Sequence, residues 1–472
     1  MNALYKMYIN QHTISKGVGE MGLVWPLVLF LLLTTSSIAE HQEDEQGLNH
    51  MHLNLHHVLG PGSPLASQSP SSVSDVLLRD GSRVKHLNYR LRNKNSATTN
   101  STSHESEHPV GPKLISTPLN PGFSIGVGNY YVKIGLGTPP NFYPMVVDTG
   151  SSFSWLQCRP CAVYCHKQVS PLFNPAASNT YKSMSCSTPQ CSSLREATLN
   201  DPLCTSKKVC VYTASYGDSS YSTGYLSQDS LKLSQSETLP GFVYGCGQDN
   251  EGLFGQSAGL IGLARHKLSM LAQLSAKYGY AFSYCLPTGR GSGGSLSIGK
   301  ASVVTKSAYK FTPMITDIRD PSLYFLRLVA IEVAGRAVGV ASASYRVPTI
   351  IDSGTVITRL PMSVYKAFTN EFTKVMSPKH KTAPAFSILD ACFKGSVKGM
   401  LAVPKVRMVF QGGADLVLSP QNLLIDVDKG NTCLAFAGSN DFAIIGNHQQ
   451  QTFSVAYDIS SSRIGFASGG CN

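Results

Sequence analysis

Val146-Val147-Asp148-Thr149-Gly150-Ser151 and Ile350-Ile351-Asp352-Ser353-Gly354-Thr355 are two stretches of this chain that share one pattern. In each stretch an apolar run leads to an aspartate, a small hydroxyl residue, a glycine and a second hydroxyl residue. The apolar run predicts a buried strand, and the residues that follow it predict a tight turn. A buried carboxylate is costly unless it is paired or hydrogen-bonded. Two such turns, 204 positions apart, therefore predict a duplicated lobe that brings two carboxylates together.

Two aspartates that share a site cannot both ionise easily, so one keeps its proton while the other stays charged. The charged carboxylate takes a proton from water, and the protonated carboxylic acid polarises an amide carbonyl. For a single copy of the pattern, an ordinary structural turn is an equally good interpretation. For two copies at this separation we favour catalysis, and we predict Asp148 and Asp352 as the catalytic pair.

The composition predicts an all-β chain with many turns. Glycine, serine, tyrosine and phenylalanine are plentiful, whereas long helical periodicities are scarce. The 472 residues are enough for two or three domains. The net charge of +11 is compatible with adhesion to polyanions, although simple solubility is the interpretation that we favour.

Twelve cysteines predict disulfides and an oxidising compartment. Seven of them lie between Cys158 and Cys210, an odd number, so at least one must pair outside this region. Zinc is the alternative, because Cys158, Cys161, Cys165 and His166 lie close together in the sequence. No second pair of ligands follows at the spacing of a zinc finger, so we expect no metal and no cofactor.

The N-terminal region carries the features of a signal peptide. An apolar run from Leu23 to Leu33 is too short to span a bilayer comfortably, and Ser37-Ile38-Ala39 provides small residues at a cleavage site. We predict a signal peptide over residues 1–39, no membrane span, and a secreted protein in the apoplast or cell wall. Met21 remains an alternative start, and a membrane anchor is disfavoured by Pro26 and by the short run.

Residues 40–116 differ in composition from the rest of the chain. They contain no cysteine and eight of the thirteen histidines, and the only glycosylation sequon that we find begins at Asn100. Apolar residues from Val73 to Leu91 recur near helical spacing among several arginines. We predict a removable pro-segment whose basic helix covers the acidic cleft, and a disordered linker is the alternative. Our hypothesis is that histidine protonation between about pH 7 and 5 loosens this segment.

Further motifs make the chain resemble a known family. Trp155 follows Asp148 by seven residues, and Tyr216 lies in a Gly- and Ser-rich run that suits a mobile hairpin. Leu260-Ile261-Gly262 and Ile444-Ile445-Gly446 provide a matching pair of apolar runs. With the two aspartate turns, these motifs make residues from about Tyr130 to the C-terminus similar to pepsin-type aspartic proteases, and closely to the plant nepenthesin-like branch.

The resemblance implies an all-β, bilobal pepsin-like aspartic protease fold with a few short helices. The N-terminal β lobe would span 128–305 with a cysteine-rich insert at 158–210, and the C-terminal β lobe would span 306–472. Cys392 and Cys433 would form a disulfide, as in the family at large. Tyr216 would be the flap tyrosine, bonded to Trp155, in contact with substrate. The dyad-supporting residues would be Thr149, Gly150, Ser151, Ser353, Gly354 and Thr355.

We therefore expect an aspartic endopeptidase, made as a secreted zymogen, that hydrolyses peptide bonds through a water activated by Asp148 and Asp352. We expect polypeptide substrates, a monomer and no binding to nucleic acid. One alternative is a catalytically silent, inhibitor-like binding protein, which would lose the catalytic turns. The other is a nucleic-acid-associated plastid aspartic protease, which the leucine-rich N-terminal run argues against.

Overall fold

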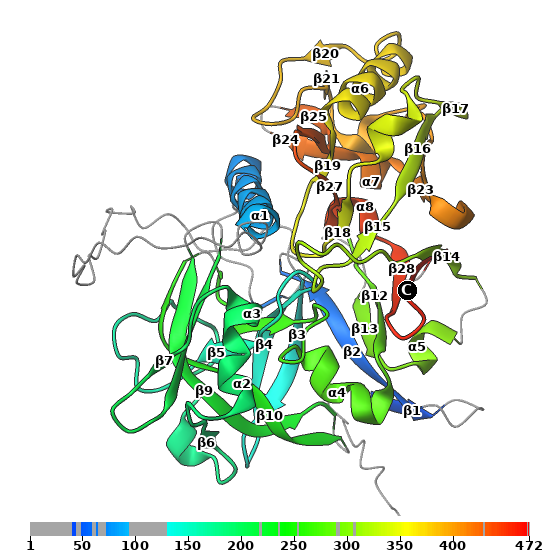
Figure 1. The fold of residues 1–472 in the computed structure, drawn as a ribbon. Coiled ribbons are helices and arrows are strands. Elements are labelled where there is room, and N and C mark those ends of the chain that lie inside the picture. Colours follow the sequence, from blue (N-terminus) through cyan, green and yellow to red (C-terminus); the bar gives the residue numbers. More distant parts are fainter. Residues whose placement is uncertain are drawn as a thin grey trace, which may run out of the picture. The chain divides into compact units, whose positions relative to one another are not determined.

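The computed structural model describes residues 40–43, 49–58, 63–64, 72–93, 130–216, 220–234, 237–252, 254–288, 293–304, 308–427, 430–469 and 471. The expected signal peptide, the end of the expected pro-segment at 116 and the sequon at Asn100 lie outside these residues. Strands dominate what is described, which confirms the all-β expectation (Figure 1). Within the described residues, no helix combines the length and the apolar character needed to cross a membrane.

The largest sheet joins strands from both ends of the described chain. Strand β2, before the first aspartate turn, and strands β28 and β29, near the C-terminus, belong to it. Its main path runs in the order β14 (Lys310–Pro313), β29 (Arg463–Ser468), β28 (Phe453–Asp458), β12 (Ala281–Cys285), β13 (Gly294–Ile298), β2 (Asn49–His57), β3 (Tyr130–Leu136), β4 (Asn141–Asp148), β11 (Gly259–Gly262), β5 (Trp155–Gln157), β10 (Thr238–Glu251), β9 (Tyr221–Lys232), β8 (Cys210–Ser215) and β7 (Leu203–Cys204). Two short strands lie off this path, β1 (Glu40–Glu43) beside β2 and β6 (Lys182–Ser183) beside β9.

Three smaller sheets are formed by the region after residue 320. The first contains β15 (Phe325–Leu326), β18 (Thr349–Ile351), β27 (Ala443–Ile445), β19 (Thr358–Pro361) and β26 (Phe436–Ser439). The second contains β17 (Arg336–Ala337), β16 (Leu328–Val333), β22 (Val406–Phe410) and β23 (Asp415–Leu418). The third contains β20 (Thr382–Ala383), β21 (Cys392–Lys394), β25 (Asn431–Leu434) and β24 (Leu424–Val427).

The helices are mostly short. Among the described residues the two longest are α1 (Val73–Asn93) and α6 (Met362–Met376), and the other α-helices there are α2 (Pro189–Ser192), α3 (Leu194–Thr198), α4 (Met270–Tyr278), α5 (Ala301–Val304), α7 (Pro420–Leu423) and α8 (Asn447–Gln450). Helix α1 confirms the helix expected in the 40–116 region. Its buried apolar side chains are the adjacent pair Val76 and Leu77, then Val84, Leu87 and Leu91 at further intervals of seven, three and four residues, so they share one face.

Both aspartate turns leave a strand that pairs in parallel with a glycine-ended strand. Strand β4 pairs with β11, which places Asp148 opposite Gly262, and β18 pairs with β27, which Gly446 follows. A Cβ atom on Gly262 would lie 2.5 Å from the Ser151 carbonyl oxygen, and one on Gly446 would lie 2.5 Å from that of Val356. Glycine is therefore required where each turn crosses its partner strand.

Strand β2 is an element that the sequence interpretation missed. We expected the N-terminal lobe to begin at residue 128, yet β2 pairs with both β13 and β3 in the largest sheet. The signal was a strict alternation, because Met51, Leu53 and Leu55 are buried and a polar residue lies between each pair.

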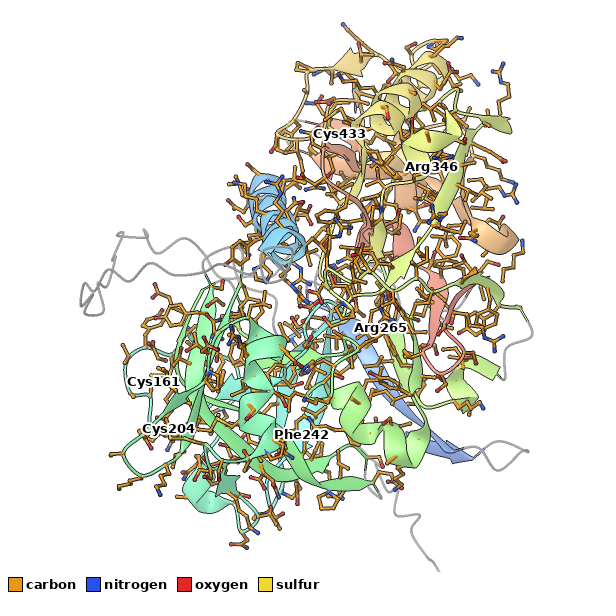
Figure 2. All side chains as sticks on the ribbon, in the orientation of Figure 1. Cys161, Cys204, Phe242, Arg265, Arg346 and Cys433 are labelled. Atoms are coloured by element: carbon orange, nitrogen blue, oxygen red, sulfur yellow. A yellow bond between two sulfur atoms is a disulfide. The ribbon has the colours of Figure 1, made fainter. Side chains whose placement is uncertain are left out.

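All twelve cysteines form disulfides. The seven cysteines between 158 and 210 make three local bonds, Cys161–Cys165, Cys186–Cys204 and Cys191–Cys210, and one bond outside, Cys158–Cys246. The remaining pairs are Cys285–Cys471 and Cys392–Cys433. Figure 2 labels Cys161 and Cys204 in the insert and Cys433 in the later half of the chain. The cysteines considered for zinc are thus joined as disulfides, and the described residues contain no other group of metal-ligating side chains.

Candidate active site

Asp148 and Asp352 are both buried, with 3% and 0% of their surfaces exposed. In the first turn, Ser151 Oγ donates to Asp148 Oδ2, and the Gly150 main-chain N–H donates to Oδ1 at 2.9 Å. The second turn repeats this arrangement. Thr355 Oγ1 donates to Asp352 Oδ2 at 2.7 Å, and Gly354 N–H donates to Oδ1 at 3.3 Å.

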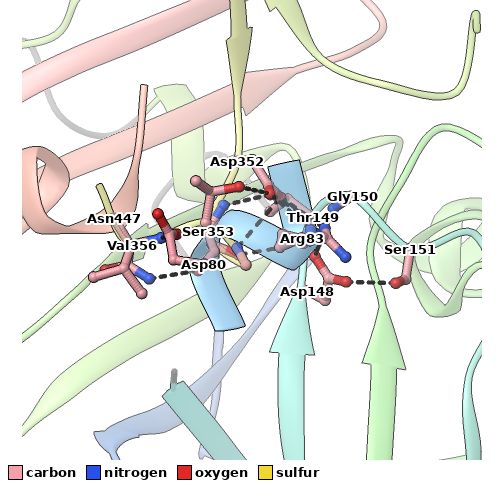
Figure 3. A network of polar contacts seen from close by, with 12 residues as sticks. Asp80, Arg83, Asp148, Thr149, Gly150, Ser151, Asp352, Ser353, Val356 and Asn447 are labelled. Atoms are coloured by element: carbon pink, nitrogen blue, oxygen red, sulfur yellow. Dashed lines mark hydrogen bonds and ion pairs between the residues drawn. The ribbon is translucent and has the colours of Figure 1, made fainter. Parts of the chain in front are cut away.

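The two turns are also bonded to each other (Figure 3). Ser353 N–H donates to Thr149 Oγ1 at 2.9 Å, and Thr149 N–H donates to Ser353 Oγ at 3.2 Å. Asn447 Nδ2, at the start of α8, donates to the main-chain oxygen of Ser353 at 2.9 Å. These reciprocal bonds hold the turns at fixed separation, because moving either turn would leave buried polar groups unpaired.

A single cation lies against both carboxylates. Arg83, on α1, places Nη2 2.8 Å from Asp148 Oδ1 and 3.2 Å from Asp352 Oδ2 (Figure 3). Burial alone would raise the pKa of Asp148, but the charge of Arg83 and the bonds from Ser151 and Gly150 outweigh it and lower that pKa. Burial acts against the charged form of Arg83 too, and the two aspartates outweigh it and raise its pKa.

Two further charged residues fix α1 in the cleft. Asp80 Oδ2 pairs with Arg359 Nη2 at 2.6 Å, and Asp80 Oδ1 accepts the N–H of Val356 at 2.5 Å. Arg90 pairs with Asp320 at 2.7 Å. The apolar face packs in two places, with Val76 and Leu77 beside the Cys392–Cys433 bond and Val84, Leu87 and Leu91 beside Phe325 and Ile350. The helix is therefore anchored on both sides of the dyad.

The expected flap contact is present in the geometry. Trp155 Nε1 donates to the Tyr216 hydroxyl at 2.7 Å, and Tyr216 ends the run that leaves β8. The ring of Phe254 lies edge-on to both, with centroids 4.7 Å from Trp155 and 5.5 Å from Tyr216. His166, in the insert, also packs on Phe254, with 5.5 Å between the ring centroids.

The sequence did not single out Arg83, Asp80, Arg90 or Phe254. The sequence signal of the three charged residues is their spacing, since Asp80, Arg83, Leu87 and Arg90 recur at three or four residues and thus share one face of α1. Phe254 lies in a glycine-flanked loop without periodicity, so nothing in the pattern marks it.

Comparison with known proteins places the chain among plant proteases. Family models described as "Xylanase inhibitor N-terminal" and "Xylanase inhibitor C-terminal" match residues 130–300 and 323–468. An aspartyl protease family protein of Arabidopsis thaliana is 41% identical over 86% of this chain and 83% of its own length. Aspartic proteinase nepenthesin-2 of Nepenthes gracilis is 34% identical over 73% of this chain and 78% of its own length.

Solved structures support the fold. The crystal structure of basic 7S globulin from soybean superposes with a TM-score of 0.58 at 22% identity, over 72% of this chain and 91% of that one. Conglutin gamma, a basic 7S globulin from lupine seeds, gives a TM-score of 0.57 at 21% identity, over 72% and 92% of the two chains. At this identity the likeness concerns the fold alone.

Proposed function

Because this chain belongs to the plant aspartyl protease family and is an aspartic-type endopeptidase, we propose that Asp148 and Asp352 are its catalytic dyad and that it is made as a secreted zymogen. One observation carries the proposal. A single guanidinium nitrogen of Arg83 lies within 3.2 Å of a carboxylate oxygen of each aspartate, so a water molecule in its place would reach both.

The chemistry follows from two carboxyl groups with one proton between them. The ionised carboxylate takes a proton from the water as its oxygen attacks the peptide carbonyl carbon, while the protonated carboxylic acid donates to the carbonyl oxygen. Collapse of the tetrahedral intermediate breaks the C–N bond, and the leaving nitrogen takes a proton from the dyad. The two aspartates titrate as a pair, so neither role belongs to one of them in the resting enzyme.

The supporting residues keep this geometry rigid. Ser151 and Thr355 bond to Oδ2 of each carboxylate, and the Gly150 and Gly354 N–H groups bond to Oδ1, so both carboxylates keep a fixed orientation towards the position that Arg83 Nη2 holds. Tyr216, held by Trp155, is placed to close over an extended peptide and to exclude bulk water from the dyad.

Inhibition by the N-terminal region is the finer part of the proposal. Helix α1 occupies the dyad through Arg83, and its anchors at Asp80 and Arg90 block a peptide from binding.

We place the signal peptide at 1–39, the pro-segment at 40–116, glycosylation at Asn100 and the lobes at 128–305 and 306–472. Six disulfides support passage through an oxidising secretory route to the apoplast or cell wall. We propose that the protein acts there on polypeptides as a monomer. Both catalytic turns are intact, which disfavours the inhibitor-like alternative, and the leucine-rich run at 23–33 disfavours the plastid alternative.

The test is acid activation of the secreted full-length chain. We expect the protein to be inactive at neutral pH, to lose residues up to about 116 on acidification, and then to cleave a denatured protein substrate. Asp148→Asn and Asp352→Asn should each abolish cleavage while leaving the thermal unfolding temperature unchanged. Full activity of either variant would overturn the assignment of the dyad, and activity of the unprocessed chain at neutral pH would overturn the zymogen.

A further inference from the structure

Arg90 makes a set of contacts in the cleft that is separate from those of Arg83. Its Nε donates to Asp320 Oδ2 at 2.8 Å, and its Nη2 donates to Ser322 Oγ at 3.0 Å. Its Nη1 donates to the main-chain oxygen of Gly150 at 2.5 Å. Gly150 belongs to the first aspartate turn, so one guanidinium group links that turn to Asp320.

The acceptors around Arg90 are held by the body of the chain and not by α1. The Asp320 side chain is 1% exposed, and its Oδ1 accepts from Ser322 N–H at 3.2 Å and from Ser322 Oγ at 2.6 Å. These bonds orient Asp320 so that Oδ2 faces Arg90. Three oxygen atoms in fixed positions match the planar fork of a guanidinium group.

A second cation, Arg265, which Figure 2 labels, lies near Asp320, because its main-chain N–H donates to the Ser322 oxygen at 2.9 Å. Its Nη1 donates to Thr316 Oγ1 at 3.1 Å, and its Nη2 donates to the Leu323 main-chain oxygen at 2.7 Å. Its guanidinium carbon lies 5.8 Å from the centroid of the Tyr324 ring. Arg265 thus bonds to acceptors of its own and does not take the position that Arg90 holds at Asp320 Oδ2.

The order of contacts along α1 places this position relative to the dyad. Asp80 reaches Val356, Arg83 reaches the two aspartates, and Arg90 reaches Gly150, so Asp80 and Arg90 contact opposite sides of the catalytic pair. Arg83 and Arg90 are seven residues apart, about 10 Å along a helix. In an extended peptide this distance corresponds to about three residues.

Resting on the proposed function, we propose that Asp320, Ser322 and the Gly150 carbonyl form a subsite for an arginine or lysine side chain of the substrate. The basic residue lies two or three positions from the scissile bond, and its cation takes the place of Arg90 once α1 has left. Charge-assisted bonds to a shielded carboxylate give a preference of about 10- to 100-fold over an uncharged residue. Arginine is preferred to lysine because it donates to all three acceptors at once.

The test compares peptides that differ at one residue. Full-length protein activated by acid is given a peptide series with Arg, Lys, Gln or Glu at each of the three positions on either side of one cleavage site. We expect one position at which kcat/KM for Arg exceeds that for Gln by the stated factor. The Arg-to-Gln ratio of kcat/KM should fall to near one in Asp320→Asn. In Asp320→Lys, the peptide with Glu at this position should be cleaved better than the peptide with Arg.

Asp317→Asn is the matched control, because Asp317 pairs with Arg319 at 2.6 Å through partly buried atoms and makes no contact with Arg90 among those described. It should keep the wild-type ratio. A wild-type profile without a basic preference overturns the inference whether or not the variants fold, and so does an unchanged ratio in Asp320→Asn. If the wild type cleaves no peptide at all, the proposed function fails and takes this inference with it.

Discussion

Arg83 and Asp148 form an ion pair at the centre of the cleft, with 2.8 Å between Nη2 and Oδ1. The Arg83 side chain is 14% exposed and that of Asp148 is 4% exposed, so water screens this pair only weakly. The same guanidinium also faces Asp352. One side chain of the N-terminal region thus neutralises the charge that the catalytic chemistry requires.

Replacing Arg83 should release the cleft. In Arg83→Gln the two carboxylates lose their cation, and we expect docking of α1 to weaken by about 3 kcal/mol, as for a buried ion pair that loses one partner. The full-length variant should then cleave a peptide at a mildly acidic pH at which the wild type is silent. Lys85→Gln, which removes an exposed charge from the same helix, should behave like the wild type. An unchanged onset of activity in Arg83→Gln would contradict the blocking role.

Replacing Asp352 should remove catalysis without unfolding the chain. In Asp352→Asn only one carboxyl group remains, so the pair can no longer supply both the proton acceptor and the proton donor, and we expect kcat to fall by about a thousandfold. The measurement is peptide cleavage after acid treatment, alongside thermal unfolding to show that the fold persists. Retention of a tenth of the wild-type rate would rule out an equal partnership of the two aspartates.

The reciprocal bonds between Thr149 and Ser353 should be energetically coupled. Thr149→Val and Ser353→Ala each remove one side-chain acceptor and leave a buried N–H group unpaired, which costs about 1 to 3 kcal/mol. The double variant should lose less than the sum of the two single losses, because both act on one network. Urea unfolding of the four proteins measures the coupling, and strictly additive losses would show that the turns are held by other contacts.

Acid should weaken docking of the N-terminal region through its buried histidines. Burial, with a smaller contribution from His448, lowers the pKa of His57 to about 4, and burial beside Arg90 and Arg83 lowers the pKa of His86 to about 3. The two neutral histidines contribute fully to the free energy of docking above pH 6.5, the approximate pKa of a free histidine. This contribution is lost as the pH falls towards their lowered pKa values. For His57 the loss is about 3 kcal/mol. The pH range over which docking weakens thus extends below the range of pH 7 to 5 that we expected from the sequence.

The test is the pH at which half of the full-length protein is processed. His57→Phe and His86→Phe keep an aromatic ring that cannot take a proton, so we expect processing to require a lower pH. Asp80 acts in the opposite sense, since burial raises its pKa and its protonation favours the docked state. His380→Phe, outside the N-terminal region, serves as the control. An unchanged midpoint in both of the first two variants would exclude a histidine trigger.

Much of the site was readable because its signals are local. An apolar strand followed by Asp, a hydroxyl residue and Gly encodes a strand and a turn within six residues, and two copies imply a pair. Helices α4 and α6 carry the same kind of local signal, since their apolar residues recur at helical spacing. Strand β2 carried an equally local alternation, but the histidines around it drew the interpretation towards a polar segment.

The amino-acid sequence by itself determined the two aspartate turns, the all-β class and the need for one cysteine to pair outside the insert. Only the tertiary structure decided that Cys246 is that partner, that Arg83 among several arginines meets the dyad, and that Phe254 packs on Tyr216. The physical reason is that strand and turn preferences act between neighbours in the chain. Pairing across 65 or 88 positions depends instead on how whole elements pack, and no local pattern encodes that packing.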